Sequence, residues 1–291
     1  MGHRSKLVGS LVVLCLLLLT FAGCSKAKEL APALVLKKAY AATTEEVTSY
    51  HFSISGAVTA DGMGEIGIFE GEADYLAPDR LRWRVTKGSG GLVIRLGETI
   101  MIGNRMYMRE SESSPWTMRE FPQEMSPMAT GLAEMVDLQK NLEFMKSPSE
   151  SVVKLDDEAI DGVESWRYRT SVDLLETQIR AMEEETDPEL KASLQELVEI
   201  FRKQAMTQTT EVWIGKEDYL VRQLRVATSQ NAAGSQGFGD ITIPEGTRFT
   251  VTMTLRFSGF NEPVEIEAPS VAAGVGIPFP PSPPTPTGPA P

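Results

Sequence analysis

The strictest alternation in this chain of 291 residues lies in residues 248–258, which read RFTVTMTLRFS. Apolar side chains occupy every second position from Phe249 to Phe257, and the positions between them carry only Arg, Thr and Ser. Because successive side chains of a strand point to opposite faces, this pattern predicts a strand with one buried and one solvated face. A sheet of such strands is antiparallel and needs a cover on one face only.

The same alternation recurs along the rest of the chain. Residues 50–58 and 80–85 both show it, and the second run places Arg80, Arg82 and Arg84 on its polar face. That arginine stripe fits either attraction of lipid phosphates or a charged strand face that guards against aggregation. Hairpin turns are predicted at Gly103-Asn104 and Asp161-Gly162, since both pairs tolerate the positive φ that tight turns need.

Three segments have the period of amphipathic helices, namely residues 31–48, 129–146 and 173–206. The last is split by residues 186–189, where Asp187 can cap a helix that starts with Pro188. None of the three is placed as a crossover between parallel strands. The sequence therefore predicts an α+β fold, a curved antiparallel β half-barrel with helices packed in its concave face.

The N-terminus has the layout of an export signal. Arg4 and Lys6 precede an apolar run at residues 11–19, which is shorter than the roughly 20 residues of a membrane-spanning helix. Gly23-Cys24 follows where an ordinary signal has an A-x-A-like site, and this resembles a bacterial lipobox with Phe21 in the usual place of Leu. We expect cleavage after residue 23 and lipidation of Cys24; plain secretion and an uncleaved anchor are the alternatives.

Export would leave a mature chain without a free thiol, because Cys15 departs with the signal and Cys24 is blocked. No disulfide, thiol chemistry or cysteine metal site is then expected. Loss of Arg4 and Lys6 takes the net charge from −12 to −14. So acidic a chain is a poor partner for nucleic acid, whose binding depends on cationic side chains.

Catalytic signatures are missing from the mature sequence. His51 is its single histidine, and no G-x-S-x-G nucleophile motif accompanies it. The acidic run at residues 183–187 lacks the alternating ligands and central glycine of a calcium loop. We therefore predict no enzyme activity, no catalytic residue, no metal site and no cofactor.

Four stretches and the N-terminal signal carry a resemblance to a known group. The stretches are YHFS at 50–53, DGVESWRY at 161–168, VWIGKEDYLVR at 212–222 and FNEPVEI at 260–266. With the lipobox and the opening helix, residues 31–268 resemble LppX/LprG-type lipoproteins of the LolA/LolB-like superfamily. The resemblance implies a half-barrel closed by helices around an apolar cavity for acyl chains, without catalytic residues. The acidic helical segment 173–206 and the proline-rich end depart from it.

These observations divide the chain into four parts. They are a signal peptide (1–23), a tether (24–30), a half-barrel domain (31–268) and a disordered tail (269–291), in which eight of the last fourteen residues are proline. Eight of thirteen methionines lie between Met101 and Met145, a composition that suits a surface for varied apolar partners as well as ordinary core filling. The candidate cavity residues are Phe52, Ile54, Leu81, Trp83, Met135, Leu194, Met253, Leu255 and Phe257.

The expected function is that of a monomeric lipoprotein, anchored on the extracytoplasmic face of the cell membrane, that binds or transfers a lipid or acylated ligand. The alternative is a binding or sensor lipoprotein with a packed core. Such a protein would act on envelope proteins through its surface or its proline-rich tail.

Overall fold

The structure is a computed structural model. It describes residues 30–90, 97–121, 142–146, 152–172, 186–232 and 241–271, together with residues 179, 182, 183, 234 and 236–238. The apolar run at 11–19, Cys24, Met135 and most of the helices predicted at 129–146 and 173–187 lie outside these residues. No helix among the described ranges is both long enough and apolar enough to cross a membrane.

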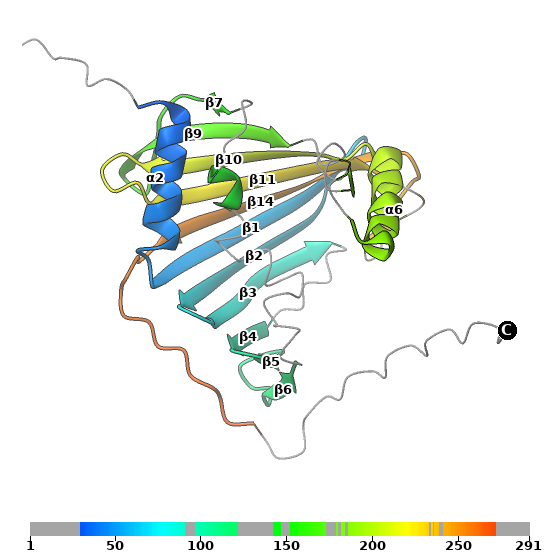
Figure 1. The fold of residues 1–291 in the computed structure, drawn as a ribbon. Coiled ribbons are helices and arrows are strands. Elements are labelled where there is room, and N and C mark those ends of the chain that lie inside the picture. Colours follow the sequence, from blue (N-terminus) through cyan, green and yellow to red (C-terminus); the bar gives the residue numbers. More distant parts are fainter. Residues whose placement is uncertain are drawn as a thin grey trace, which may run out of the picture.

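One open antiparallel sheet of 12 strands forms most of the described structure (Figure 1). Its strands run in the order β6-β5-β4-β3-β2-β1-β14-β11-β10-β9-β7, and β8 also pairs with β9. The first six are β1 (Ser49–Ala60), β2 (Gly64–Leu76), β3 (Arg80–Gly90), β4 (Gly97–Ile102), β5 (Arg105–Arg109) and β6 (Thr117–Glu120). The others are β7 (Val153–Lys154), β8 (Glu158–Ile160), β9 (Val163–Val172), β10 (Thr207–Gly215), β11 (Val221–Asn231) and β14 (Arg248–Ser258).

A small second sheet pairs β12 (Gln236–Phe238) with β13 (Ile241–Ile243). The helical elements are α2 (Pro32–Thr44), α6 (Pro188–Gln204) and the short 3-10 helix η2 (Glu143–Met145). The strand predicted from the alternation at 248–258 is confirmed as β14, with the same bounds. The hairpin predicted at Asp161-Gly162 is confirmed too, and both residues have positive φ, 50° and 82°.

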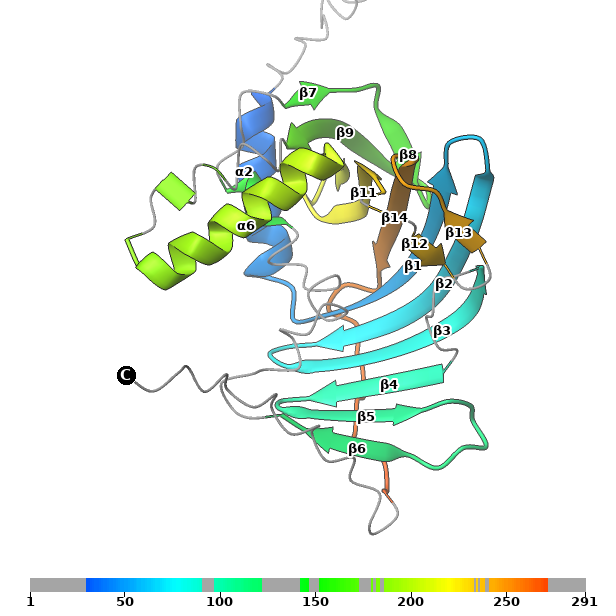
Figure 2. The same cartoon turned by 90° about the vertical axis from the view of Figure 1, so that its right-hand side faces the viewer.

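The first and last strands of the sheet meet at its centre. In the β1–β14 pair, Phe52 lies opposite Phe257 and Ile54 lies opposite Leu255. A meander from β1 to β6 extends the sheet on one side of this pair, and β11, β10 and β9 extend it on the other. The sheet is curved, and α2 and α6 lie on its concave side (Figure 2). The predicted open, curved half-barrel is therefore confirmed.

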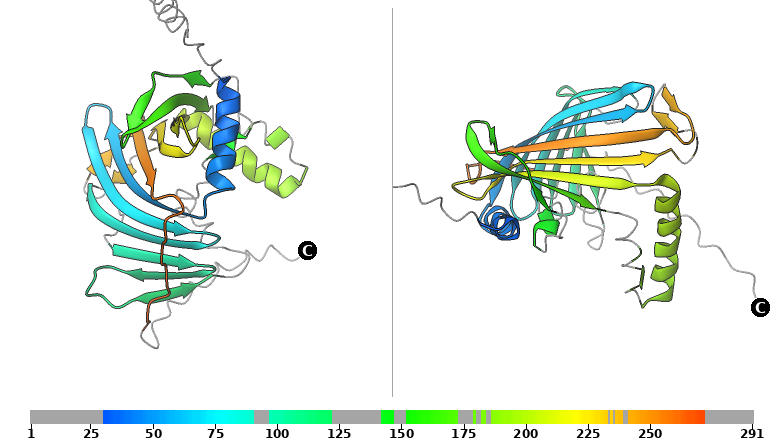
Figure 3. Two further views of the ribbon diagram at one scale, coloured as in Figure 1. Left: turned by 90° about the vertical axis from the view of Figure 1, so that its left-hand side faces the viewer. Right: turned by 90° about the horizontal axis from the view of Figure 1, so that it is seen from above.

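The two helices lie at opposite ends of the strands (Figures 1 and 3). α2 begins with Pro32 at its first turn, where a missing N–H costs nothing, and buries Val35, Leu36 and Ala39. The hydroxyl of Thr43 accepts a hydrogen bond of 3.1 Å from the backbone N–H of Val221, which fixes α2 to β11. The predicted helix at 31–48 thus ends at residue 44, because the chain must turn to enter β1.

Candidate functional site

The inner, concave face of the sheet carries a row of apolar side chains that runs from β14 to β3 and ends at Thr99 on β4. The register places Phe257, Phe52, Ala73, Trp83 and Thr99 side by side on β14, β1, β2, β3 and β4. Alternation puts one side chain of every two on this face, and antiparallel pairing then aligns them across strands. One hydrophobic cluster contains this face together with residues of α2 and η2.

Seven of the nine candidate cavity residues meet in that cluster. They are Phe52, Ile54, Leu81, Trp83, Met253, Leu255 and Phe257, all of them buried. Leu194 lies on α6, which contacts β11, and its side chain is half-buried. It does not belong to the cluster. Met135 lies outside the described residues. The strand positions therefore converge as expected, and their contact with a ligand stays a prediction.

Aromatic rings gather where β1 enters the sheet. Tyr50 stacks on Tyr75 with ring centroids 4.8 Å apart and meets Phe257 edge-on at 5.8 Å. Phe52 lies 5.9 Å from Phe257. On β9, at the other side of the β1–β14 pair, burial raises the pKa of Tyr168 to about 12, and the charges of Asp157 and Tyr219 make smaller contributions. Tyr50, Phe257 and Tyr168 are each at most 3% exposed, so this face has little access to water.

The described helices cover only part of this face. β1 has 12 residues, so it is about 40 Å long at about 3.3 Å per residue. α2 crosses the strands near one end (Figure 1), and a helix with its side chains is about 10–12 Å wide. η2 adds the buried side chain of Met145, with Leu142 just before it. Most of the length of the inner face thus lies beyond α2.

Trp83 has a polar atom on this apolar face. The side chain is 2% exposed, and its indole Nε1 has no hydrogen-bond partner in the part of the chain that the structure describes. Sequence reasoning treated Trp83 as apolar and missed this donor. The sequence did indicate a donor here, because the indole of a buried tryptophan carries one N–H that normally finds a hydrogen-bond partner.

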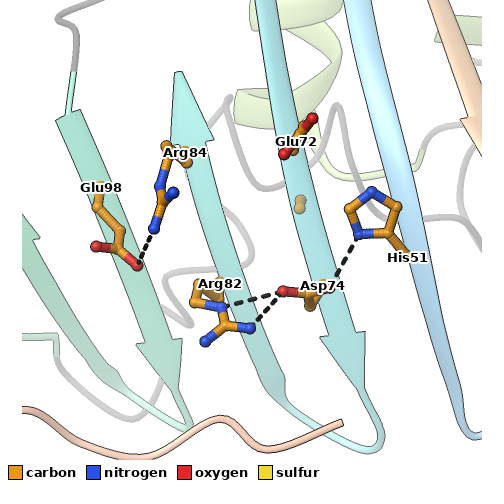
Figure 4. Close-up of a pocket in the computed structure, with 7 residues that line it drawn as sticks. His51, Glu72, Asp74, Arg82, Arg84 and Glu98 are labelled. Carbon is orange, nitrogen blue, oxygen red and sulfur yellow. Dashed lines mark hydrogen bonds and ion pairs between the residues drawn. The ribbon is translucent and has the colours of Figure 1, made fainter. Parts of the chain in front are cut away.

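The outer face carries cross-strand charge pairs and a pocket of about 260 Å³ (Figure 4). His51 Nδ1 lies 3.0 Å from one oxygen of Asp74, and Arg82 donates to the other oxygen from Nη2 at 2.7 Å. Burial alone would raise the pKa of Asp74, but the hydrogen bonds and charges of His51 and Arg82 hold it below its usual value. Arg84 lies 3.7 Å from Glu98, which also accepts hydrogen bonds from Arg109.

The chemistry of this pocket is limited to carboxylates, guanidinium groups and one imidazole. Its lining residues supply no hydroxyl or thiol nucleophile beside His51. No group of three or more His, Cys, Asp or Glu that could hold a metal ion occurs among the described residues. Arg82 and Arg84 of the predicted stripe lie on the outer face as expected, and each is bound to a carboxylate.

The alternation predicts a solvated outer face, but this face is not polar throughout. Ile100 and Tyr107 lie on the outer side of β4 and β5 and form a cluster with Ile266, which is 1% exposed. Residues 259–271 therefore act as a strap across these strands, and Arg80 Nη1 donates to the backbone oxygen of Ile266 at 3.1 Å. The end of β4 carried the signal, because Ile100, Met101 and Ile102 place apolar side chains on both faces of the sheet.

No protein-family model and no curated protein matches this chain. Among solved structures, the lipoprotein LppX of Mycobacterium tuberculosis is 12% identical with a TM-score of 0.38, and the match covers 81% of this chain and 100% of that one. LprF of Mycobacterium bovis is 12% identical with a TM-score of 0.43, covering 82% and 96%. A LolA superfamily protein of Nitrosomonas europaea is 10% identical with a TM-score of 0.26, covering 79% and 92%.

The names LppX and LolA also occur in the group that the sequence resembles. With identities of 12% or less and TM-scores below 0.5, none of them assigns a family or a function to this chain.

Proposed function

We propose that this chain is a non-enzymatic lipoprotein that binds acyl chains of a lipid on the inner face of its sheet. The observation that supports the proposal is the unbroken apolar row across β14, β1, β2 and β3, of which the described helix α2 covers only one end. A long acyl chain gains about 0.8 kcal/mol for each methylene group that it buries, so several methylenes suffice for stable binding.

Binding requires the cover of the inner face to shift. Phe52, Ile54 and Leu255 are at most 2% exposed, so an acyl chain reaches them only by displacing whatever packs on them. The free energy of that displacement is subtracted from the gain of burying the ligand, and the protein then exchanges its own apolar contacts for those of the lipid. Such near-balance suits a carrier, which has to release its cargo as well as bind it.

We further propose that Cys24 carries the lipid anchor, at the extracytoplasmic face of the cell membrane. Five residues separate Cys24 from Leu30, the first described residue, and the six steps along the chain reach at most about 20 Å. α2 therefore stays close to the membrane that supplies the lipid. Cys24→Ala should release the protein from the membrane fraction, and the wild type should show the added mass of acyl groups. Wild-type protein that stays in solution without that mass would refute the anchor.

Native mass spectrometry of the protein purified from its own host tests the lipid ligand. We expect a lipid that dissociates from the folded protein on activation, in addition to any covalent anchor. Brominated fatty acid gives a second test, since a bromine atom quenches an indole that it contacts. Quenching should fall in Trp83→Phe and persist in Trp213→Phe, because Trp213 lies on the outer face. A bare protein mass together with no quenching would refute the proposal.

The alternative is a lipoprotein with a packed core that acts on envelope proteins through its surface or its proline-rich tail. The near-complete burial of the inner face favours this alternative, since a filled core has the same property. The two functions differ in one measurable respect. Only a lipid carrier should release a non-covalently bound lipid when it is denatured, and bind lipid again when lipid is added after refolding.

A further inference from the structure

The indole nitrogen of Trp83 is a buried donor that has no hydrogen-bond partner among the described residues. A buried polar group without a partner costs about 1–3 kcal/mol, so such groups are rare in folded proteins. The outer face gives the comparison, because Trp213 Nε1 donates to Glu158 Oε2 at 2.9 Å. The fold thus provides an acceptor for the outer indole and none, among the described residues, for the inner one.

The surroundings of this donor are shaped by Gly71. Trp83 Nε1 lies 3.5 Å from the position that a Cβ on Gly71 would take, and Cγ2 of Ile54 lies 3.3 Å from it. The backbone oxygen of Arg84 is 2.8 Å from the same position, so no larger residue fits without a shift. Gly71 pairs with Ile54 on one side and with Val85 on the other. The N–H edge of the indole therefore lies over a strand position that has no side chain and is flanked by apolar ones.

We propose that Trp83 Nε1 donates a hydrogen bond to the ester carbonyl of an acyl lipid that displaces the present cover of the indole on the inner face. This inference rests on the proposed function and narrows the ligand class. The donor requires an acceptor, and an acyl ester has one beside its apolar chain. A neutral carbonyl suits the site better than an ionised carboxylate, since an uncompensated charge is costly on an apolar face. The inner face then selects acyl esters over hydrocarbon or ether chains of equal length.

Binding of a matched pair of ligands tests this selectivity. The probes are a palmitoyl ester and the hexadecyl ether of the same alcohol, which differ in the carbonyl alone. We expect the wild type to prefer the ester and Trp83→Phe to lose about tenfold in affinity for it, the size of a hydrogen bond of about 1.4 kcal/mol. Affinity for the ether should be unchanged, and Trp213→Phe should bind both probes as the wild type does.

The four tryptophan indole N–H signals in a ¹⁵N NMR spectrum give a readout that needs no stable variant at Trp83. After assignment with the other three Trp→Phe variants, the Trp83 signal should shift downfield with the ester and not with the ether. The inference would be overturned if Trp83→Phe lost equal affinity for both probes, or if the Trp83 indole signal did not shift with the ester. Either result would leave lipid binding itself intact. A wild type that binds neither probe would instead refute the proposed function itself.

Discussion

Arg167 Nη2 donates a hydrogen bond of 2.7 Å to Oε2 of Glu211, across the outer face of the neighbouring strands β9 and β10. The other carboxylate oxygen accepts from Arg169 at the same distance. Glu211 is 7% exposed, so this carboxylate is the buried partner between two more exposed guanidinium groups.

Replacing Glu211 by Gln should lower the free energy of unfolding by about 2 kcal/mol, because two charge-assisted hydrogen bonds are weakened in a largely buried place. Urea unfolding followed by circular dichroism measures the change. The control is Glu217→Gln in the exposed turn before β11, where we expect a change within about 0.5 kcal/mol. Equal effects of the two substitutions would contradict the structural role given to Glu211.

The same carboxylate predicts how stability depends on pH. Burial alone would raise the pKa of Glu211, but Arg167 and Arg169 outweigh it and hold the pKa below the usual 4.5. A group with a depressed folded-state pKa stabilises the protein above its unfolded-state pKa, and that contribution disappears as the pH falls through the folded-state value. The difference in unfolding midpoint between wild type and Glu211→Gln should therefore be largest near neutral pH and shrink below about pH 4.5.

Asp74 offers a direct titration test of the outer-face pairs. Its pKa lies below 3.8 because hydrogen bonds and charges of His51 and Arg82 overcome the effect of burial. Arg82→Gln should move the pKa of Asp74 upward, and carboxyl ¹³C NMR follows it. The matched control is Arg105→Gln, since Arg105 pairs with Glu120 at the edge of the sheet, away from Asp74. If neither substitution changed the pKa of Asp74, the result would argue against its pairing with Arg82.

The strap is tested by truncating Ile266 to Ala. Truncating a fully buried isoleucine lowers the free energy of unfolding by about 2–5 kcal/mol. Here we expect the destabilisation to be concentrated in β4 to β6, on which Ile266 packs. Hydrogen exchange should show faster exchange of backbone amides in those strands than in β14. Glu267→Ala, at the exposed neighbouring position, should leave the exchange pattern unchanged.

Strands and turns were predictable from the sequence because they depend on local chemistry. The alternation of residues 248–258 and the positive φ of Asp161-Gly162 each need only neighbours in the chain. The inner face followed from the same alternation, which is why seven of its candidate residues cluster.

Contacts between distant segments were not predictable in this way. Alternation gives the face of Asp74 but not its register, and register alone decides that it lies between His51 and Arg82. The strap was missed for the same reason, since nothing near Ile266 indicates that it packs on Ile100. The sequence shows that Trp83 has an N–H donor, but not that this donor has no partner among the described residues, because that requires knowing the atoms around it.

The pairing of β1 with β14 has a consequence for how the molecule is made. Thr48 and Asn261 are 213 residues apart in sequence, yet the backbone N–H of Thr48 donates to Asn261 Oδ1 at 2.8 Å. Closing so long a loop is entropically costly, and proteins with such topology fold slowly. Translation must pass residue 258 before β14 can join the β1–β6 meander to β11, β10 and β9, so the two parts of the sheet cannot meet until this last strand has been made.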